Sequence, residues 1–242
     1  MARKLDEIAG AQFDGVMSPP RPDLKTLGSL RYWAITSFGV DSDVERGVEE
    51  AAALGAEALT VQLGDFDSSL QDMVKLANRI CEAATRAALP TAIEVHRDTF
   101  TETPERTSEL QRAFSLATGE YLEICWDFSH IAVVRHLRPP FSSLLDPKED
   151  ILRSSQFHLR PFNGHHCQIP ASDGLGGRAP EYCDWLEWAR DLFELIRNSR
   201  ASSIRIAPEL GNAAPAYGLA CFPDVWEDTK QVLRDLKNLE LR

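Results

Sequence analysis

The sequence lacks long apolar runs. No stretch of the 242-residue chain approaches the roughly 20 consecutive apolar residues that a bilayer-spanning helix needs. The N-terminal segment MARKLDEIAGAQF is charged and helical in pattern, and it has no apolar stretch resembling a signal peptide. We therefore expect a cytoplasmic protein with no membrane partner.

Positive charge is also scarce. The chain has 26 Lys and Arg against 37 Asp and Glu, which gives a net charge of −11. Surfaces that bind DNA or RNA need a basic footprint, so we expect no nucleic-acid partner. The five cysteines are scattered and form no C-x-x-C pair, and a chain of this size does not need disulfides to hold its core.

Short apolar runs rich in β-branched residues alternate with helical patterns along the whole chain. The runs that we expect to form strands are 13–18, 31–37, 58–63, 91–96, 121–127, 155–160 and 203–209. The patterns that we expect to form the clearest helices are 3–9, 70–88, 179–197 and 225–239. Alternating units of this kind imply parallel strands joined by right-handed crossovers.

The absence of a G-x-G-x-x-G turn after any strand disfavours an open dinucleotide-binding sheet. We predict one α/β domain over residues 1–242, a (β/α) TIM barrel. Such a barrel has eight strands, and the chain opens on a helical pattern where the first strand would stand. The barrel is thus expected to be incomplete at its first strand, with the seam open or covered by an irregular segment or a partner chain, as in a homo-oligomer.

Helix ends are marked by local signals. Ser42 and Glu45 have the spacing of a capping box, in which each side chain satisfies a backbone N–H of the other residue. Gly55 is expected to end that helix. Thr103 followed by Pro104 predicts an N-cap and a first helical position.

Four expected strands in succession end on a side chain that can bind a metal. These residues are Glu94, Asp127, His158 and Glu209. Active sites of barrel enzymes lie at the C-terminal ends of the strands, where side chains from several strands converge. Three carboxylates and one imidazole favour one divalent ion, Mn²⁺ or Mg²⁺, with Co²⁺, Fe²⁺ and Zn²⁺ also open.

Ordinary structural roles are the alternative for each of these residues. They could face solvent or pair with nearby arginines, namely Arg97, Arg160 and Arg205. Their occurrence on consecutive strands favours a shared site over four unrelated roles.

Three further polar residues are candidates for substrate contact. Arg160 follows His158 by two positions, so on a strand it would share the same face and could bind a substrate oxygen. His96 has the same relation to Glu94 and could bind substrate or act as a base. Gln62 lies near the end of the 58–63 run and could contact substrate or act as a simple cap.

The order Glu94, Asp127, His158, Glu209 resembles the xylose isomerase-like TIM-barrel superfamily, in particular its sugar phosphate isomerase/epimerase branch. A histidine three residues after the aspartate, His130 in Asp127-Phe128-Ser129-His130, adds to the resemblance. The opening LDEIAGAQFDGVMSPP is similar to the first helix and second strand of that family. The resemblance covers nearly the whole chain.

The resemblance implies roles for these residues. All four would be metal ligands, Glu94 and Glu209 would also act as the acid/base pair on opposite faces of the substrate, and His130 would contact a substrate hydroxyl. The implied activity is a divalent-metal-dependent isomerisation or epimerisation of a keto-sugar or a similar carbonyl compound through an enediolate.

The sequence departs from the family pattern in three places. Met17 stands where the second strand of the family often ends in glutamate. Downstream of Glu94, where epimerases carry an asparagine, this chain has His96. Epimerases usually place an acidic residue between the histidine and the arginine, and the segment HLRPFNGHH has none between His158 and Arg160. Two alternatives therefore stay open. One is a metal-dependent lyase or dehydratase acting on a keto-sugar or keto-polyol, and the other is an inactive barrel that binds a sugar or a protein.

Overall fold

Parallel strands alternate with helices throughout the computed structural model, which describes residues 2–211 and 217–240. Seven strands form one sheet in chain order, and every ladder described is parallel. The strands are β1 (Gly15–Ser18), β2 (Arg31–Phe38), β3 (Leu59–Leu63), β4 (Thr91–Glu94), β5 (Ile124–Asp127), β6 (Gln156–His158) and β7 (Arg205–Ala207). The predicted strands are thus all found, and a helix precedes the first of them.

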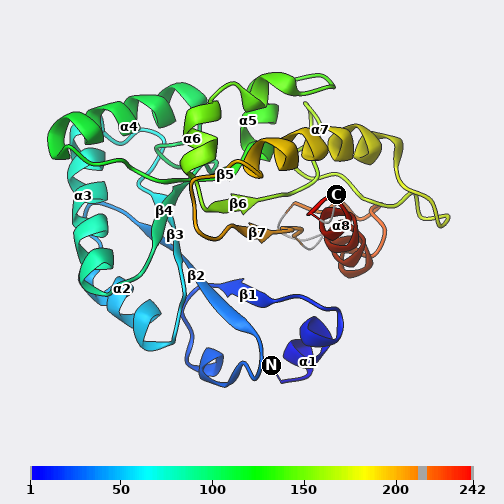
Figure 1. Cartoon of the computed structure of the whole chain (residues 1–242), viewed down its shortest axis with the longest axis horizontal. Coiled ribbons are helices and arrows are strands. Elements are labelled where there is room, and N and C mark those ends of the chain that lie inside the picture. Colours follow the sequence, from blue (N-terminus) through cyan, green and yellow to red (C-terminus); the bar gives the residue numbers. More distant parts are fainter. Residues whose placement is uncertain (1, 212–216, 241–242) are drawn as a thin grey trace. The chain divides into compact units, whose positions relative to one another are not determined.

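The helices connect these strands in the predicted alternation (Figure 1). They are α1 (Ala2–Gly10), α2 (Val44–Ala53), α3 (Leu70–Arg86), α4 (Pro104–Thr118), α5 (Phe128–Val134), α6 (Lys148–Arg153), α7 (Pro180–Ile196) and α8 (Val225–Glu240), with 3-10 turns η1 (Pro22–Thr26) and η2 (Ser142–Leu145). None of the helices within the described ranges has the length and apolar character needed to cross a membrane.

The chain divides into two compact units, residues 1–125 and 126–242, and the division falls inside β5. In the first unit α2 packs against α3 and α3 against α4, beside strands β2 to β4 (Figure 1). Ala51, Val61 and Ile80 are fully buried between these helices and strands. A single domain over 1–242 stays a prediction.

The second unit has an aromatic core. Trp185 and Trp188 of α7 are buried, and Phe128 meets the Trp188 ring edge-on at a centroid distance of 5.0 Å. Tyr182, also on α7, donates its hydroxyl to Asp235 of α8 at 3.0 Å. The aromatic contact joins α5 to α7, and the Tyr182–Asp235 hydrogen bond joins α7 to α8.

Helix α2 begins differently from the prediction. Ser42 Oγ accepts from the Gly39 N–H at 2.9 Å, which shapes the preceding turn. Asp43 is the N-cap, and its carboxylate accepts from the Arg46 N–H at 3.2 Å. The predicted capping box of Ser42 and Glu45 is therefore wrong, because the helix begins one residue later, with Asp43 as its N-cap, and the Ser42 hydroxyl accepts from Gly39 instead.

The two other predicted helix-end signals are confirmed. Thr103 Oγ1 accepts from the Arg106 N–H at 3.3 Å, and Pro104 opens α4. Gly55 follows α2 with a φ of 80°, a left-handed conformation that glycine adopts without steric cost.

Several strands end earlier than predicted. β4 ends at Glu94, β6 at His158 and β7 at Ala207. Side chains alternate between the two faces of a sheet only within a strand. Because His96 and Glu209 lie beyond the ends of β4 and β7, this alternation does not determine the direction of their side chains.

Candidate metal centre

Asp127 is the last residue of β5 and also the N-cap of α5. Its Oδ1 accepts from the Ser129 N–H at 2.9 Å and from the Ser129 hydroxyl at 2.6 Å. Its Oδ2 lies 3.2 Å from Arg160 Nη2 and 3.3 Å from His130 Nε2. The side chain is fully buried, so these contacts fix both oxygens in place.

His158 ends β6, and its side chain is fully buried. The register of β6 with β7 sets His158 beside Ala207, and Glu209 follows two residues later. His158 Nδ1 lies 3.1 Å from Glu209 Oε2. Glu209 was predicted on a strand end but lies in the segment after β7, with its side chain 36% exposed.

Arg160 connects the two carboxylates of the second unit. Its side chain is fully buried, and Nη2 donates to Glu209 Oε1 at 2.6 Å and to Asp127 Oδ2 at 3.2 Å. The Tyr217 ring covers the guanidinium, with 3.9 Å between Cζ and the ring centroid. Within the described residues, Nε and Nη1 have no hydrogen-bond partner. Pairing with an arginine, one of the structural alternatives, is thus observed for Asp127 and Glu209.

This charge arrangement keeps both carboxylates ionised. Burial alone would raise the pKa of Asp127, but His130 and Arg160 outweigh it and hold that pKa well below its usual range. Burial likewise opposes ionisation of Glu209, yet the contacts with His158 and Arg160 lower its pKa to about 2. Burial tends to lower the pKa of Arg160, and the two carboxylates reverse that and raise it.

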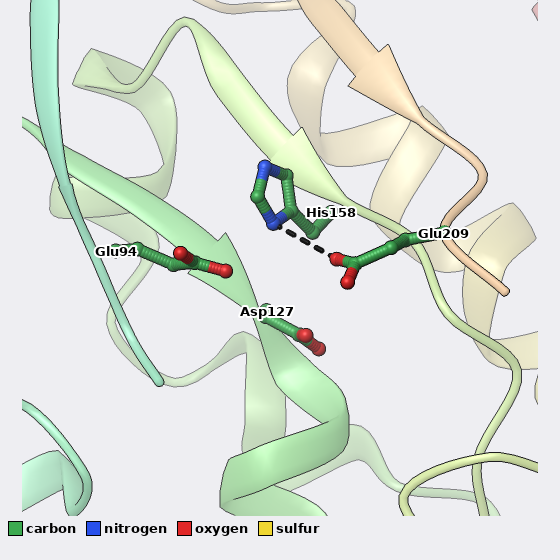
Figure 2. A group of neighbouring side chains, drawn as sticks. All are labelled: Glu94, Asp127, His158 and Glu209. Atoms are coloured by element: carbon green, nitrogen blue, oxygen red, sulfur yellow. Dashed lines mark ion pairs between the residues drawn. The ribbon is translucent and has the colours of Figure 1, made fainter. Parts of the chain in front are cut away.

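Glu94 belongs to the first unit, where it is the last residue of β4 and is buried. It is in register with Cys125 on β5, and Asp127 stands two residues further along the same strand. One ligand atom from each of Glu94, Asp127, His158 and Glu209 lies within 4.8 Å of the others. Figure 2 shows the four neighbouring side chains and the ion pair between His158 and Glu209.

The donor set suits a divalent ion. Carboxylate oxygens are hard ligands and imidazole nitrogen is borderline, a combination that fits Mg²⁺, Mn²⁺ and other first-row dications. A dication would also offset the negative charge that three carboxylates bring into a buried place. These residues could therefore hold a metal.

His130 is also close to this group. It lies on α5 and is buried. Besides its approach to Asp127, its ring lies 6.3 Å from the Tyr217 ring centroid. Its predicted contact with a substrate hydroxyl stays a prediction.

His96 and Gln62 lie in the first unit. His96 is half-buried beyond the end of β4, and its Nδ1 lies 2.7 Å from the Arg97 carbonyl oxygen. Gln62 is on β3, where its Oε1 accepts from the Ser37 hydroxyl at 2.8 Å across the β2–β3 ladder. The cap of the next helix is Ser69. Substrate contacts for His96 and Gln62 stay predictions.

Two residues at the site escaped the sequence reasoning. Ser129 stands two positions after Asp127, a spacing typical of a helix N-cap, and that signal could have identified it. Tyr217 stands in an irregular segment without periodicity, and no local signal connects it with Arg160.

Comparison of the sequence with protein-family models and with curated proteins gives no match. Solved structures do match. A D-tagatose 3-epimerase-like protein aligns with a TM-score of 0.64 and 15% identity, over 100% of this chain and 94% of that one. The chain has the fold of the xylose isomerase-like TIM barrels.

Two other solved structures agree with this fold. The probable 3-DHS dehydratase AsbF of Bacillus anthracis aligns with a TM-score of 0.61 and 18% identity, over 97% of this chain and 93% of that one. A xylose isomerase-like TIM barrel protein from Mycobacterium smegmatis, in complex with magnesium, aligns with a TM-score of 0.58 and 13% identity, over 99% and 89%. The predicted fold class is confirmed, and identities this low carry no activity to this chain.

Proposed function

We propose that the protein is a divalent-metal-dependent isomerase or epimerase of a keto-sugar or a sugar-like carbonyl compound. The observation that carries the proposal is the grouping of Glu94, Asp127, His158 and Glu209, whose ligand atoms lie within 4.8 Å of one another. Mg²⁺ or Mn²⁺ is the favoured ion. The resemblance of the fold to a D-tagatose 3-epimerase-like protein supports the reaction class.

The two glutamates are the proposed acid/base pair. Bound at these four residues, the ion would act as a Lewis acid toward the substrate carbonyl and lower the cost of the enediolate. Glu94 and Glu209 would remove a proton from the adjacent carbon and return it. A positioned carboxylate contributes typically about 10²–10⁴-fold as a general base.

Glu209 is ionised and partly accessible, as the proposed base must be. Its contacts with His158 and Arg160 lower its pKa to about 2, so the carboxylate carries its negative charge at neutral pH. The side chain is 36% exposed, which leaves it accessible to a substrate. Asp127 and His158, both fully buried, serve as ligands only.

Arg160 is the proposed anchor for substrate oxygens. Buried N–H groups without an acceptor are costly, and Nε and Nη1 of Arg160 have none within the described residues. Hydroxyl or carbonyl oxygens of a polar, unphosphorylated or phosphorylated sugar-like molecule would satisfy them. His130 is proposed to bind a hydroxyl, and His96 and Gln62 are the substrate contacts proposed for the first unit.

A lyase is the second candidate. If a hydroxyl group on the carbon next to the enediolate takes a proton from the acid/base pair and leaves as water, a dehydrated product forms. The resemblance of the fold to a probable dehydratase favours this candidate.

Metal analysis tests the proposal. Purified protein should bind one equivalent of Mn²⁺ in calorimetric titrations, and Glu94→Gln or His158→Ala should abolish the binding. Glu109→Gln, on the exposed face of α4, is the matched control and should bind as wild type does. A wild-type protein that binds no divalent ion would contradict the proposal and support a binding module instead.

Solvent exchange then separates the two reactions. In D₂O an epimerase or isomerase should incorporate deuterium at the carbon next to the carbonyl of its ketose without losing water from it. A lyase should also release a dehydrated product, visible by NMR.

A further inference from the structure

Glu209 is the ligand candidate of the second unit that needs an additional restraint. Asp127 and His158 are the last residues of strands and are fully buried. Glu209 lies outside any strand, its side chain is 36% exposed, and among the described residues its carboxylate pairs with the side chains of His158 and Arg160. Burial and strand pairing therefore do not suffice to fix the backbone that carries this carboxylate.

The side chain of Gln168 holds that backbone at Gly211, two residues after Glu209. Gln168 Oε1 accepts from the Gly211 N–H at 2.8 Å, and Gln168 Nε2 donates to the Gly211 carbonyl at 3.0 Å. Both bonds go to the same residue, so the amide acts as a neighbouring strand would and fixes the direction of the chain as well as its position. Gln168 is 2% exposed, which shields both bonds from competing water.

The segment that carries Gln168 is itself held at the residues that follow Gln168. Ile169 N–H donates to the Pro161 carbonyl at 2.9 Å. Further along, the carboxylate of Asp228 on α8 accepts from the N–H groups of Ala171 and Ser172 at 3.0 and 3.1 Å. Gln168 thus projects from an anchored backbone, which gives its amide a fixed place from which to hold Gly211.

On one side Glu209 is already fixed by the sheet. Leu159 N–H donates to the Ala207 carbonyl at 2.8 Å and so continues the β6–β7 ladder to the end of β7. The residues 208–210 are then the span between the ladder at Ala207 and the Gln168 bonds at Gly211. Glu209 lies in the middle of this short span, held at both ends.

We propose that Gln168 is a positioning residue for Glu209. By fixing Gly211 it directs the Glu209 carboxylate toward His158 and Arg160, and so sets the place from which Glu209 binds the ion and exchanges a proton. The inference rests on the proposed function, because the carboxylate needs this accuracy only if it is a ligand and a base. Partners behind a metal ligand typically change metal affinity by about 10–100-fold when they are removed.

The test is a Mn²⁺ titration of Gln168→Leu beside wild type. Leucine keeps the size of the side chain and removes both bonds, and we expect the Kd for Mn²⁺ to rise by about tenfold or more. Gln168→Glu keeps an acceptor for the Gly211 N–H and should lose less affinity. Partial unfolding of the variant would lower the number of Mn²⁺ ions bound per chain in the titration. The Kd would still report the affinity of the molecules that are folded.

The control is Gln111→Leu. Gln111 is a half-buried glutamine on α4 whose Nε2 donates to the Leu122 carbonyl at 3.3 Å, and it touches none of the ligand candidates. Loss of a side-chain hydrogen bond should lower the Tm of both leucine variants. Only Gln168→Leu should also change the Kd for Mn²⁺. The visible spectrum of bound Co²⁺, which reports ligand geometry, should also change in Gln168→Leu alone.

The outcomes separate the two proposals. Wild type that binds Mn²⁺ while Gln168→Leu binds it equally well, with an unaltered Co²⁺ spectrum, overturns the positioning role and leaves the proposed function standing. Wild type that binds no ion overturns the proposed function, and the positioning role with it.

Discussion

The guanidinium of Arg160 donates through Nη2 to Oε1 of Glu209 at a distance of 2.6 Å. The same nitrogen lies 3.2 Å from Asp127 Oδ2, so one buried cation neutralises part of the charge of two proposed metal ligands. The second unit therefore holds its carboxylates together before any metal binds.

Replacing Arg160 by methionine should destabilise the metal-free protein. The change leaves the buried Asp127 carboxylate without its cation, and breaking a buried pair in this way costs roughly 3–5 kcal/mol. We expect about 3 kcal/mol, the lower end, because the second carboxylate is partly exposed. Urea unfolding measures the loss, and Mn²⁺ should restore part of it.

The comparison for this variant is Arg31→Met. Arg31 pairs with Glu57, but their side chains are 50% and 38% exposed, and exposed pairs contribute only about 0–1 kcal/mol. Equal losses in the two variants would show that burial of the Arg160 pairs has no energetic consequence.

Ser129→Ala should weaken metal binding without unfolding the protein. The Ser129 hydroxyl donates to Asp127 Oδ1 at 2.6 Å, and its removal takes away one of the two bonds that hold this oxygen. We expect the Kd for Mn²⁺ to rise by about tenfold, and Ser129→Thr, which keeps the hydroxyl, to restore it. Ser199→Ala removes a hydroxyl bonded to the Leu152 carbonyl instead and should leave the Kd unchanged, so an equal effect there would argue against this role.

Ionisation of the Asp235 carboxylate should make the free energy of unfolding depend on pH. Burial works against its ionisation, but bonds from Arg178, Gln231 and Tyr182 lower its pKa below the ordinary value of 3.8. A lowered pKa means that the ionised carboxylate stabilises the fold. That stabilisation is complete above the ordinary pKa and is lost as the pH falls through the folded-state pKa.

Urea midpoints between pH 3 and pH 7 measure this effect. Asp235→Asn should be less stable than wild type at neutral pH, and the difference should shrink below about pH 4. Glu149→Gln, whose carboxylate pairs with Arg200 at 73% side-chain exposure, should follow the wild-type curve. A difference between Asp235→Asn and wild type that stays constant with pH would contradict the prediction.

Asp228→Ala should loosen the segment that carries Gln168. The variant removes the acceptor for the N–H groups of Ala171 and Ser172, and hydrogen bonds to a charged group contribute about 1.5–3 kcal/mol. Hydrogen exchange at these two amides should become faster. Glu227→Gln, an exposed change on the same helix, should leave their exchange rates as they are.

The sequence predicted the strands well because each is a short apolar run with a clear polar boundary. Asp127 ends its strand as predicted, and Glu94 and His158 end theirs two residues before the predicted ends, since an ionisable side chain in the interior of a buried strand would be too costly. Glu209 was assigned to a strand because apolar residues precede it, although β7 ends at Ala207.

Contacts between distant residues could not be predicted in the same way. Gln168 and Gly211 are 43 positions apart, and neither stands in a periodic segment. Their pairing depends on how two loops meet, which no propensity or spacing records. The pairing of Arg160 with Asp127 and Glu209 was open among several arginines, because charge alone does not select a partner.

The double task of Asp127, which starts α5 and also offers an oxygen to a metal, restricts the chemistry permitted at this position. A glutamate would carry the same charge, but its extra methylene moves the carboxylate away from the Ser129 N–H that a cap must reach. An asparagine could still start the helix and would no longer bring a negative charge. The N-cap thus requires a short side chain, and the metal requires a negative charge. Aspartate alone has both.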